Sequence, residues 1–247
     1  MQDTPLFLNR IDAGKAIAQA VNQLFSQEII GCSSPPIPIV YALPRGGIPV
    51  AVPVAKALYC SLDIVVAKKI SYPEHPELAI GAVNIYGDVI WVKNDHQSWT
   101  RNLGKSWTKN KFFNDTKNLC SSESISLRKA KAMSAAIEKA KSLERQLSCA
   151  CPQIDTKDAI MILVDDGIAT GMTILVAIRA LKKLLPAQIW LCSPIAPSRL
   201  LPCLNQYVDR LIILKAPEKF ASVSEFYVNF HQVETGEALQ YLREVNG

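Results

Sequence analysis

The hydrophobic and polar positions of the chain follow two spacings, and each predicts one kind of secondary structure. Apolar residues three or four positions apart predict helices over 12–30, 49–59, 124–147, 173–185 and 197–206, with a last helix from 235. Short apolar runs, many of them β-branched, predict strands over 37–43, 62–70, 79–85, 88–93, 159–164, 188–195 and 208–214. Tyr86-Gly87 separates two of these strands and indicates a hairpin.

The order of these elements indicates the fold class. Strands that alternate with helices favour an α/β fold, with a mostly parallel central sheet and helices on both of its faces. The run at 159–164 is apolar throughout, as expected for a strand buried on both sides. We expect one domain over 1–247. Its parts would be a core at about 10–92 and 157–214, a helical and irregular insert at 93–150, and a small C-terminal hood at 215–247.

The composition narrows the class of protein. Hydrophobic residues make up 49% of the 247 residues, which is too many for a disordered chain, and no apolar run reaches the ~18 residues of a membrane span. The seven cysteines are an odd number at scattered positions, which favours reduced thiols over a disulfide framework. We therefore expect a cytoplasmic protein with no membrane contact.

The net charge of +5 is concentrated in one segment. Residues 93–145 hold twelve basic and five acidic residues, a net charge of +7, and the rest of the chain is slightly acidic. Trp99 and Trp107 lie among these cations, so nucleic-acid binding is one hypothesis for the segment. No helix-turn-helix or RNA-binding signature accompanies it, and we favour a solvated surface.

The strongest candidate for chemistry is the string ILVDDGIATGMT at 162–173. A buried strand delivers Asp165 and Asp166 at its carboxyl end, where ligands bind in open α/β sheets. A glycine-containing turn and the start of a helix follow, and their amides form a cradle for an anion. The acids suit sugar hydroxyls or a hydrated divalent metal. Although Asp-Asp-Gly alone is common in turns, the whole string fits a phosphorylated sugar.

This string resembles the phosphoribosyl-diphosphate motif of the type I phosphoribosyltransferases. Leu43-Pro44-Arg45-Gly46-Gly47, directly after a predicted strand, is similar to the pyrophosphate loop of that family. Lys68-Lys69-Ile70, with the following residues 73–82, resembles the mobile catalytic loop of a bacterial subgroup described only as phosphoribosyltransferases. Known nucleotide motifs of other kinds, the Walker A loop and the Gly-x-Gly-x-x-Gly turn, are absent from the sequence.

The resemblance implies a role for each matching residue. It assigns the ribose hydroxyls and a nearby Mg²⁺ to Asp165 and Asp166. The 5′-phosphate would be held by Ala169, Thr170, Gly171, Met172 and Thr173. Pyrophosphate would be held by Arg45, Gly46 and Gly47, in a loop that often contains a non-proline cis peptide. The catalytic residues would be Lys68, Lys69 and Arg45, which stabilise the leaving group, while the loop 71–76 closes over the substrate.

The acceptor is less well indicated. Ala169 occupies a position where enzymes for 6-oxopurines carry an aspartate, which counts against hypoxanthine and guanine. His75 in the predicted loop is a candidate general base, although a lone loop histidine is more often simply exposed. The family builds its base pocket from the hood, where the candidate residues are Phe220, Phe226, Tyr227 and Phe230.

The resemblance therefore implies an Mg²⁺-dependent enzyme that transfers ribose 5-phosphate from phosphoribosyl diphosphate to a nitrogenous acceptor such as a nucleobase. It also implies a homodimer. The alternative is a regulator that senses phosphoribosyl diphosphate in the same pocket and binds nucleic acid through the basic segment 93–145. A scaffold without turnover is a third possibility, against which the intact acids, threonines and Arg45 argue.

Overall fold

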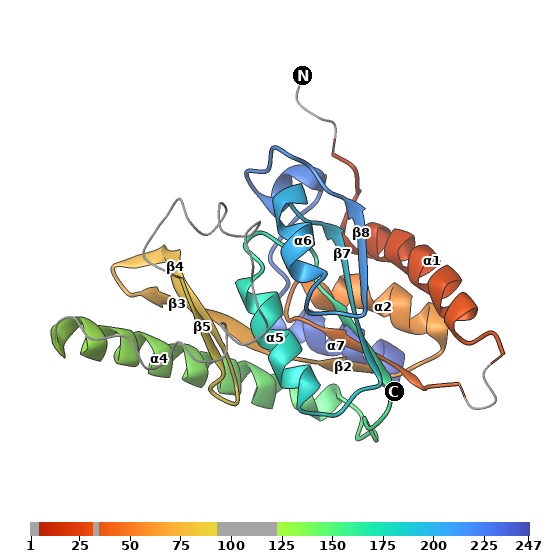
Figure 1. Ribbon diagram of the computed structural model, residues 1–247, viewed down its shortest axis with the longest axis horizontal. Helices are drawn as coiled ribbons and strands as arrows, with labels where there is room; N and C mark the ends of the chain where they lie inside the picture. Colours follow the sequence, from red (N-terminus) through yellow and green to blue (C-terminus); the bar gives the residue numbers. More distant parts are fainter. Residues whose placement is uncertain (1–4, 32–34, 93–122) are drawn as a thin grey trace.

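The computed structural model describes residues 5–31, 35–92 and 123–247, and its centre is a parallel sheet of five strands. The strand order is β2-β1-β6-β7-β8 (Figure 1). The strands are β1 (Pro38–Ala42), β2 (Leu62–Ile64), β6 (Ile160–Val164), β7 (Gln188–Ile195) and β8 (Arg210–Lys215). The α/β class and the parallel sheet expected from the sequence are confirmed.

Helices cover both faces of this sheet (Figure 1). One face is packed by α1 (Arg10–Glu28), α2 (Gly47–Leu58) and α7 (Thr235–Asn246). The other face is packed by α5 (Met172–Lys182) and the short α6 (Leu201–Leu204), which follows a 3-10 turn at Ser198–Leu200. These helices agree with the predicted ones, with ends shifted by a few residues.

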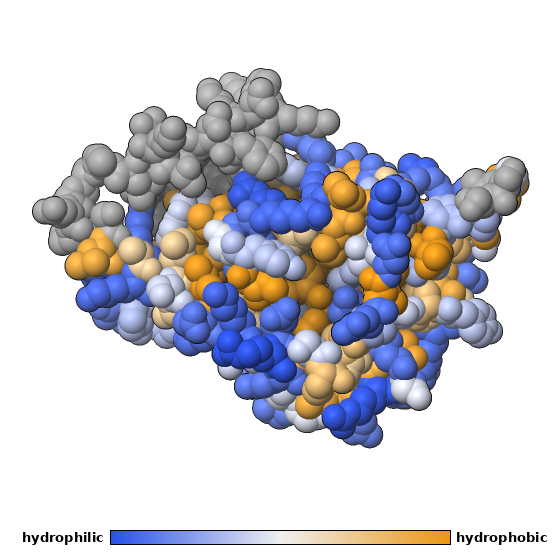
Figure 2. Space-filling model, turned by 90° about the horizontal axis from the view of Figure 1, so that it is seen from below, coloured by the Kyte–Doolittle hydropathy of each residue, from blue (hydrophilic) through white to orange (hydrophobic). Residues whose placement is uncertain are grey.

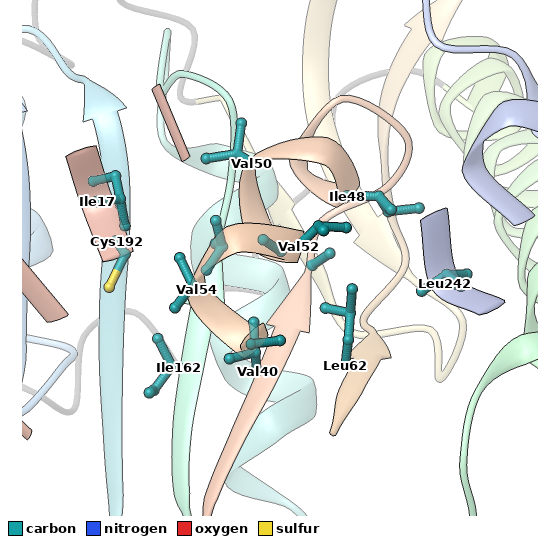
Figure 3. Packing of buried hydrophobic residues seen from close by; sticks show 14 of the residues in the cluster. Ile17, Val40, Ile48, Val50, Val52, Val54, Leu62, Ile162, Cys192 and Leu242 are labelled. Atoms are coloured by element: carbon teal, nitrogen blue, oxygen red, sulfur yellow. The ribbon is translucent and has the colours of Figure 1, made fainter. Parts of the chain in front are cut away.

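The apolar run of β6 shows why a two-sided sheet is the stable arrangement. Ile160 and Ile162 point into the core under α1 and α2, and Met161 and Leu163 point into the core under α5. All five residues of the strand are buried. Figure 3 shows Ile162 beside Val40 of the neighbouring strand, under the valines of α2. Alternate side chains therefore fill two separate cores. A polar side chain at any of these positions would be removed from water without a hydrogen-bond partner, which would destabilise the fold.

A second, antiparallel sheet lies at one end of the molecule (Figure 1). It consists of β3 (Ala67–Tyr72), β4 (His75–Asn84) and β5 (Val89–Trp91), so the predicted hairpin is confirmed. Helix α4 (Glu123–Leu147) packs on β3, where Ala132 and Ala136 contact a cluster with Ile70 and Val83. Of the insert predicted at 93–150, residues 93–122 lie outside the described residues.

One expectation for residues 62–76 was wrong. The predicted strand 62–70 is two strands in different sheets, because the chain leaves the parallel sheet at Val65 and Val66. These two residues are buried in opposite cores, so the run stays apolar where the strand ends. The predicted loop 71–76 is the tip of the β3–β4 hairpin, with Tyr72 paired to His75.

The C-terminal residues fall into two parts. After β8 the chain crosses the carboxyl ends of the parallel strands and includes a 3-10 turn at Val223–Phe226. Helix α7 then returns to the core, where Ala238 and Leu242 are fully buried with residues of α2 (Figure 3). The part that lies over the strand ends is therefore shorter than the segment 215–247.

The described helices are too short or too polar to cross a lipid bilayer. On the face seen in Figure 2, hydrophobic residues lie between hydrophilic ones and form no continuous band.

Candidate active site

The acid pair and the turn after it lie at the carboxyl end of β6. Asp165 and Asp166 directly follow the strand, and the chain turns through residues 167–171 into α5. A cavity of about 440 Å³ opens at this point. Parallel strands present their carboxyl ends at one edge of the sheet, which is where this architecture binds its ligands.

The cavity brings together all three motifs of the sequence. The residues of these motifs that line it are Arg45, Gly46, Lys68, Lys69, Asp165, Asp166, Ala169, Thr170, Gly171 and Thr173. Gly47 and Met172 stand just outside the lining, and Met172 is buried as the first residue of α5. His75 begins β4 as an exposed residue and does not line the cavity.

The turn before α5 is shaped to bind an anion. Gly171 is the N-cap of the helix and has a φ of 76°, a left-handed conformation that favours glycine. The first amides of α5 therefore point towards the cavity side without partners inside the helix, and the helix dipole adds a partial positive charge. Thr170 and Thr173 add hydroxyl donors to the same wall.

The loop after β1 lies directly against the acid pair. A Cβ atom on Gly46 would overlap Oδ2 of Asp166, and one on Gly47 would stand 2.7 Å from the carbonyl oxygen of Val164. Any side chain at either position would push the two loops apart. The peptide bond between Pro44 and Arg45 is cis, as the resemblance implied for this loop.

Arg45 is held by the start of the last helix. Its Nη1 donates a hydrogen bond of 3.0 Å to Oγ1 of Thr235 and lies 3.5 Å from a carboxylate oxygen of Glu234. Burial and the positive charges of Arg45 and Lys139 lower the pKa of Lys68. The cavity therefore concentrates cations at the end that faces β3.

The acid pair is buried and closely coupled. Oδ1 of Asp165 accepts a hydrogen bond of 2.9 Å from the backbone amide of Asp166. Burial and the charge of Asp166 raise the pKa of Asp165 well above its ordinary value. Burial also raises the pKa of Asp166, although Arg10 opposes this effect. Two adjacent carboxylates in a dry site disfavour a double negative charge, so the pair needs cations from the protein or the ligand.

Arg10 is the functional candidate that the sequence did not reveal. Its Nε donates a hydrogen bond of 2.7 Å to Oδ2 of Asp166, and its Nη1 donates one of the same length to the carbonyl oxygen of His231. The guanidinium carbon lies 3.8 Å from the ring centroid of Phe230. The available signal was weak: Arg10 is the first residue of α1, where a cation opposes the helix dipole.

Of the four predicted base-pocket residues, Phe230 lines the cavity and the other three lie elsewhere. Phe226 and Tyr227 are buried with Ala13 and Ile195, and Phe220 stacks on Phe226. Tyr227 supports the site from behind, since its hydroxyl donates a hydrogen bond of 2.6 Å to the carbonyl oxygen of Asp166. None of these three aromatic residues lines the cavity. The C-terminal residues that do line it are Val223, Phe230, Gln232 and Val233.

The acid pair suits a magnesium ion that arrives with its ligand. The described residues hold no group of three or more His, Cys, Asp or Glu side chains able to bind a metal by themselves. Mg²⁺ commonly binds through one or two carboxylates, several waters and substrate phosphates. Asp165 and Asp166 at the edge of the cavity meet that requirement.

The comparisons with known proteins decide the family. A family model described as "Phosphoribosyl transferase domain" matches residues 8–225. The chain belongs to this family. The resemblance to the phosphoribosyltransferases seen in the sequence is thereby confirmed.

Individual relatives agree with this assignment. Proteins of two Mycobacterium tuberculosis strains, CDC 1551 and H37Rv, that are named as phosphoribosyl transferases are 30% identical over 242 residues. The match covers 96% of this chain and 46% of each relative, so the chain spans about half their length. The crystal structure of TT1426 from Thermus thermophilus matches with a TM-score of 0.68 and 24% identity, over 98% of this chain and 99% of that one. This likeness supports the fold.

Proposed function

We propose that the protein transfers ribose 5-phosphate from phosphoribosyl diphosphate to a nitrogenous heterocycle, with release of pyrophosphate. The observation that carries this proposal is the common cavity of three motifs from two distant stretches of the chain: the acid pair and the threonine loop within 165–173, and the Arg45 loop. Each motif meets one part of the donor: the ribose hydroxyls, the 5′-phosphate and the diphosphate.

The ribose and its phosphate fit the wall formed by β6 and α5. The carboxylates of Asp165 and Asp166 accept hydrogen bonds from the two ring hydroxyls. The amides of residues 169–173 and the hydroxyls of Thr170 and Thr173 bind the 5′-phosphate at the helix N-terminus. The sugar is then held at both ends, which fixes the direction of its anomeric carbon.

The diphosphate fits the cationic wall on the other side of the cavity. Arg45 offers the planar fork that matches phosphate oxygens, and Lys68 and Lys69 add point charges. When bound with the substrate, Mg²⁺ near Asp165 and Asp166 would neutralise part of the diphosphate charge. The bond between the anomeric carbon and the diphosphate oxygen breaks, and the diphosphate keeps the electron pair. The lone pair of the acceptor nitrogen forms the new bond.

The acceptor itself is tested by a screen for pyrophosphate release. Purified protein with Mg²⁺ and phosphoribosyl diphosphate is mixed in turn with purines, pyrimidines and heteroaromatic acids. We expect release above background with at least one compound, together with the ribosylated product by mass spectrometry. Binding of phosphoribosyl diphosphate with no release from any acceptor would favour a sensor instead. The nucleic-acid part of that alternative depends largely on residues 93–122, which lie outside the described part of the chain.

The lowered pKa of Lys68 predicts a pH dependence of pyrophosphate binding. Lys68 carries its positive charge only below its pKa, and burial moves that pKa below the ordinary value. The affinity for inorganic pyrophosphate should therefore fall on the alkaline side, at a lower pH than the ordinary lysine pKa of ~10.4 would give. Lys68→Arg should remove this fall, because arginine stays charged. Calorimetry across pH measures it, with Lys157→Arg on an exposed loop as the control.

A further inference from the structure

Arg10 occupies a position that its local sequence does not explain. It is the first residue of α1, and a cation at a helix N-terminus is disfavoured by the dipole. Its side chain is nevertheless only 9% exposed and lines the cavity. Burial of a guanidinium costs desolvation free energy, and this cost is offset only if the group forms hydrogen bonds inside the protein. The contacts of Arg10 therefore show what the residue is placed to do.

The first of these contacts orients Asp166. The Nε–H group donates to Oδ2 at 2.7 Å, and the Asp166 side chain is 15% exposed. A carboxylate has about four lone-pair positions, so a donor on Oδ2 leaves the other oxygen and a second lone pair for a ligand. Tyr227 fixes the backbone of the same residue through its carbonyl oxygen. The carboxylate is thus held in one rotation before any ligand arrives.

The other contacts fasten the C-terminal segment to the ribose end. Nη1 donates to the carbonyl oxygen of His231 at 2.7 Å, and the guanidinium lies over the ring of Phe230. Phe230 and its neighbours Gln232 and Val233 form part of the cavity lining. One side chain therefore joins the start of α1, the acid after β6 and the segment that covers the cavity.

We propose that Arg10 is a positioning residue for the sugar. It presents the Asp166 carboxylate to the ribose hydroxyls and holds residues 230–233 over the ribose end of the cavity. This inference rests on the proposed function, because it assumes that Asp166 receives a ribose. Arg10 lies at the acid pair, whereas Arg45, which is assigned to pyrophosphate, is held by Thr235. Its removal should therefore separate two ligands that occupy different ends of one cavity.

The test compares two ligands by calorimetry, ribose 5-phosphate without metal and inorganic pyrophosphate with Mg²⁺. Arg10→Gln should weaken ribose 5-phosphate binding about 10-fold or more, since a charge-assisted hydrogen bond is lost. Pyrophosphate binding should stay within about twofold of wild type, because Arg10 contacts Asp166 and not Arg45. A twofold change in affinity corresponds to less free energy than one hydrogen bond contributes. Arg10→Lys keeps the charge but not the fork, so it should restore part of the ribose 5-phosphate affinity. Arg210→Gln, which removes a more exposed arginine–carboxylate pair with Glu28, should leave both affinities unchanged.

Several outcomes would overturn the assignment. Equal weakening of both ligands in Arg10→Gln would mean that Arg10 only supports the fold, and unchanged binding of both would mean that it positions nothing. Should Arg10→Gln fail to fold, Arg10→Lys decides alone: a selective loss for ribose 5-phosphate supports the assignment, and no loss or an equal loss overturns it. If wild type fails to bind ribose 5-phosphate, the proposed function falls first. If wild type binds it and the variants bind it equally well, only the role of Arg10 falls.

Discussion

Asp166→Asn should weaken the binding of ribose 5-phosphate about 10- to 100-fold, as expected for the loss of hydrogen bonds to a charged acceptor. The amide oxygen can still accept from Arg10, but the substitution removes the negative charge that receives the ribose hydroxyls. Calorimetry on wild type and variant measures the change. Turnover should fall with it, because the anomeric carbon is no longer held in line with the acceptor.

The same variant should lose about 1–3 kcal/mol of stability, since the ion pair with Arg10 is shielded from water. Chemical denaturation measures this loss. Glu28→Gln is the matched control, because Glu28 also pairs with an arginine, Arg210, through a hydrogen bond of 2.9 Å, but does not line the cavity. It should keep wild-type affinity for ribose 5-phosphate. Undiminished affinity in Asp166→Asn would contradict the assigned role, and loss of the folded state would make that role structural.

Arg45→Ala should slow turnover about 10²- to 10³-fold, the size seen when a preorganised donor to developing negative charge is removed. The Arg45 side chain lines the cavity in the part assigned to the diphosphate, and alanine supplies neither its charge nor its planar guanidinium. The affinity for inorganic pyrophosphate should fall as well. Steady-state kinetics in both directions, with calorimetry for pyrophosphate, measure the two effects.

The control for Arg45 uses the contact that holds it. Thr235→Val keeps the arginine but removes the hydroxyl that accepts from its Nη1 at 3.0 Å. This variant should show a much smaller loss of turnover, because the charge remains in the cavity. The Arg45 side chain is 25% exposed, so its loss should change the unfolding free energy little. A strong loss of stability with normal pyrophosphate binding would contradict the proposed role.

The parts of the site that the sequence predicted are those formed by contiguous residues. The acid pair and the threonine loop follow one another at 162–173, because a strand end, a turn and a helix start are local structures. Gly46 and Gly47 belong to a similar local motif, and they pack so closely on Asp166 and Val164 that a side chain at either position would clash. Local spacing was therefore sufficient to predict these elements.

The parts that the sequence did not predict depend on contacts between distant residues. Arg10 and Asp166 are 156 positions apart, and no local pattern brings them together. Tyr227 and Phe226 were expected to line a base pocket, but their rings are buried beneath the site instead. The sequence pattern of an aromatic cluster is the same in a base pocket and in a packed core, because both need large apolar side chains at irregular spacing.

The strand pairing shows the same limit of local sequence patterns. The run at 62–70 is most strongly β-branched at 64–66, yet the chain changes sheets there, at Val65 and Val66. The sequence does not show this change of sheet, because Val65 and Val66 are each buried in one of the two cores. The junction between the strands is therefore as apolar as a strand. Only the pairing partners reveal it: β2 pairs with β1, and β3 pairs with β4.

The most direct test of the central claim is calorimetric titration of the wild-type protein with phosphoribosyl diphosphate in the presence of Mg²⁺. The proposed function predicts saturable binding at one site per chain, lost in a variant that carries both Asp165→Asn and Asp166→Asn and reduced in Arg45→Ala. Absence of binding by the folded wild-type protein, or equal binding by the doubly substituted variant, would contradict it.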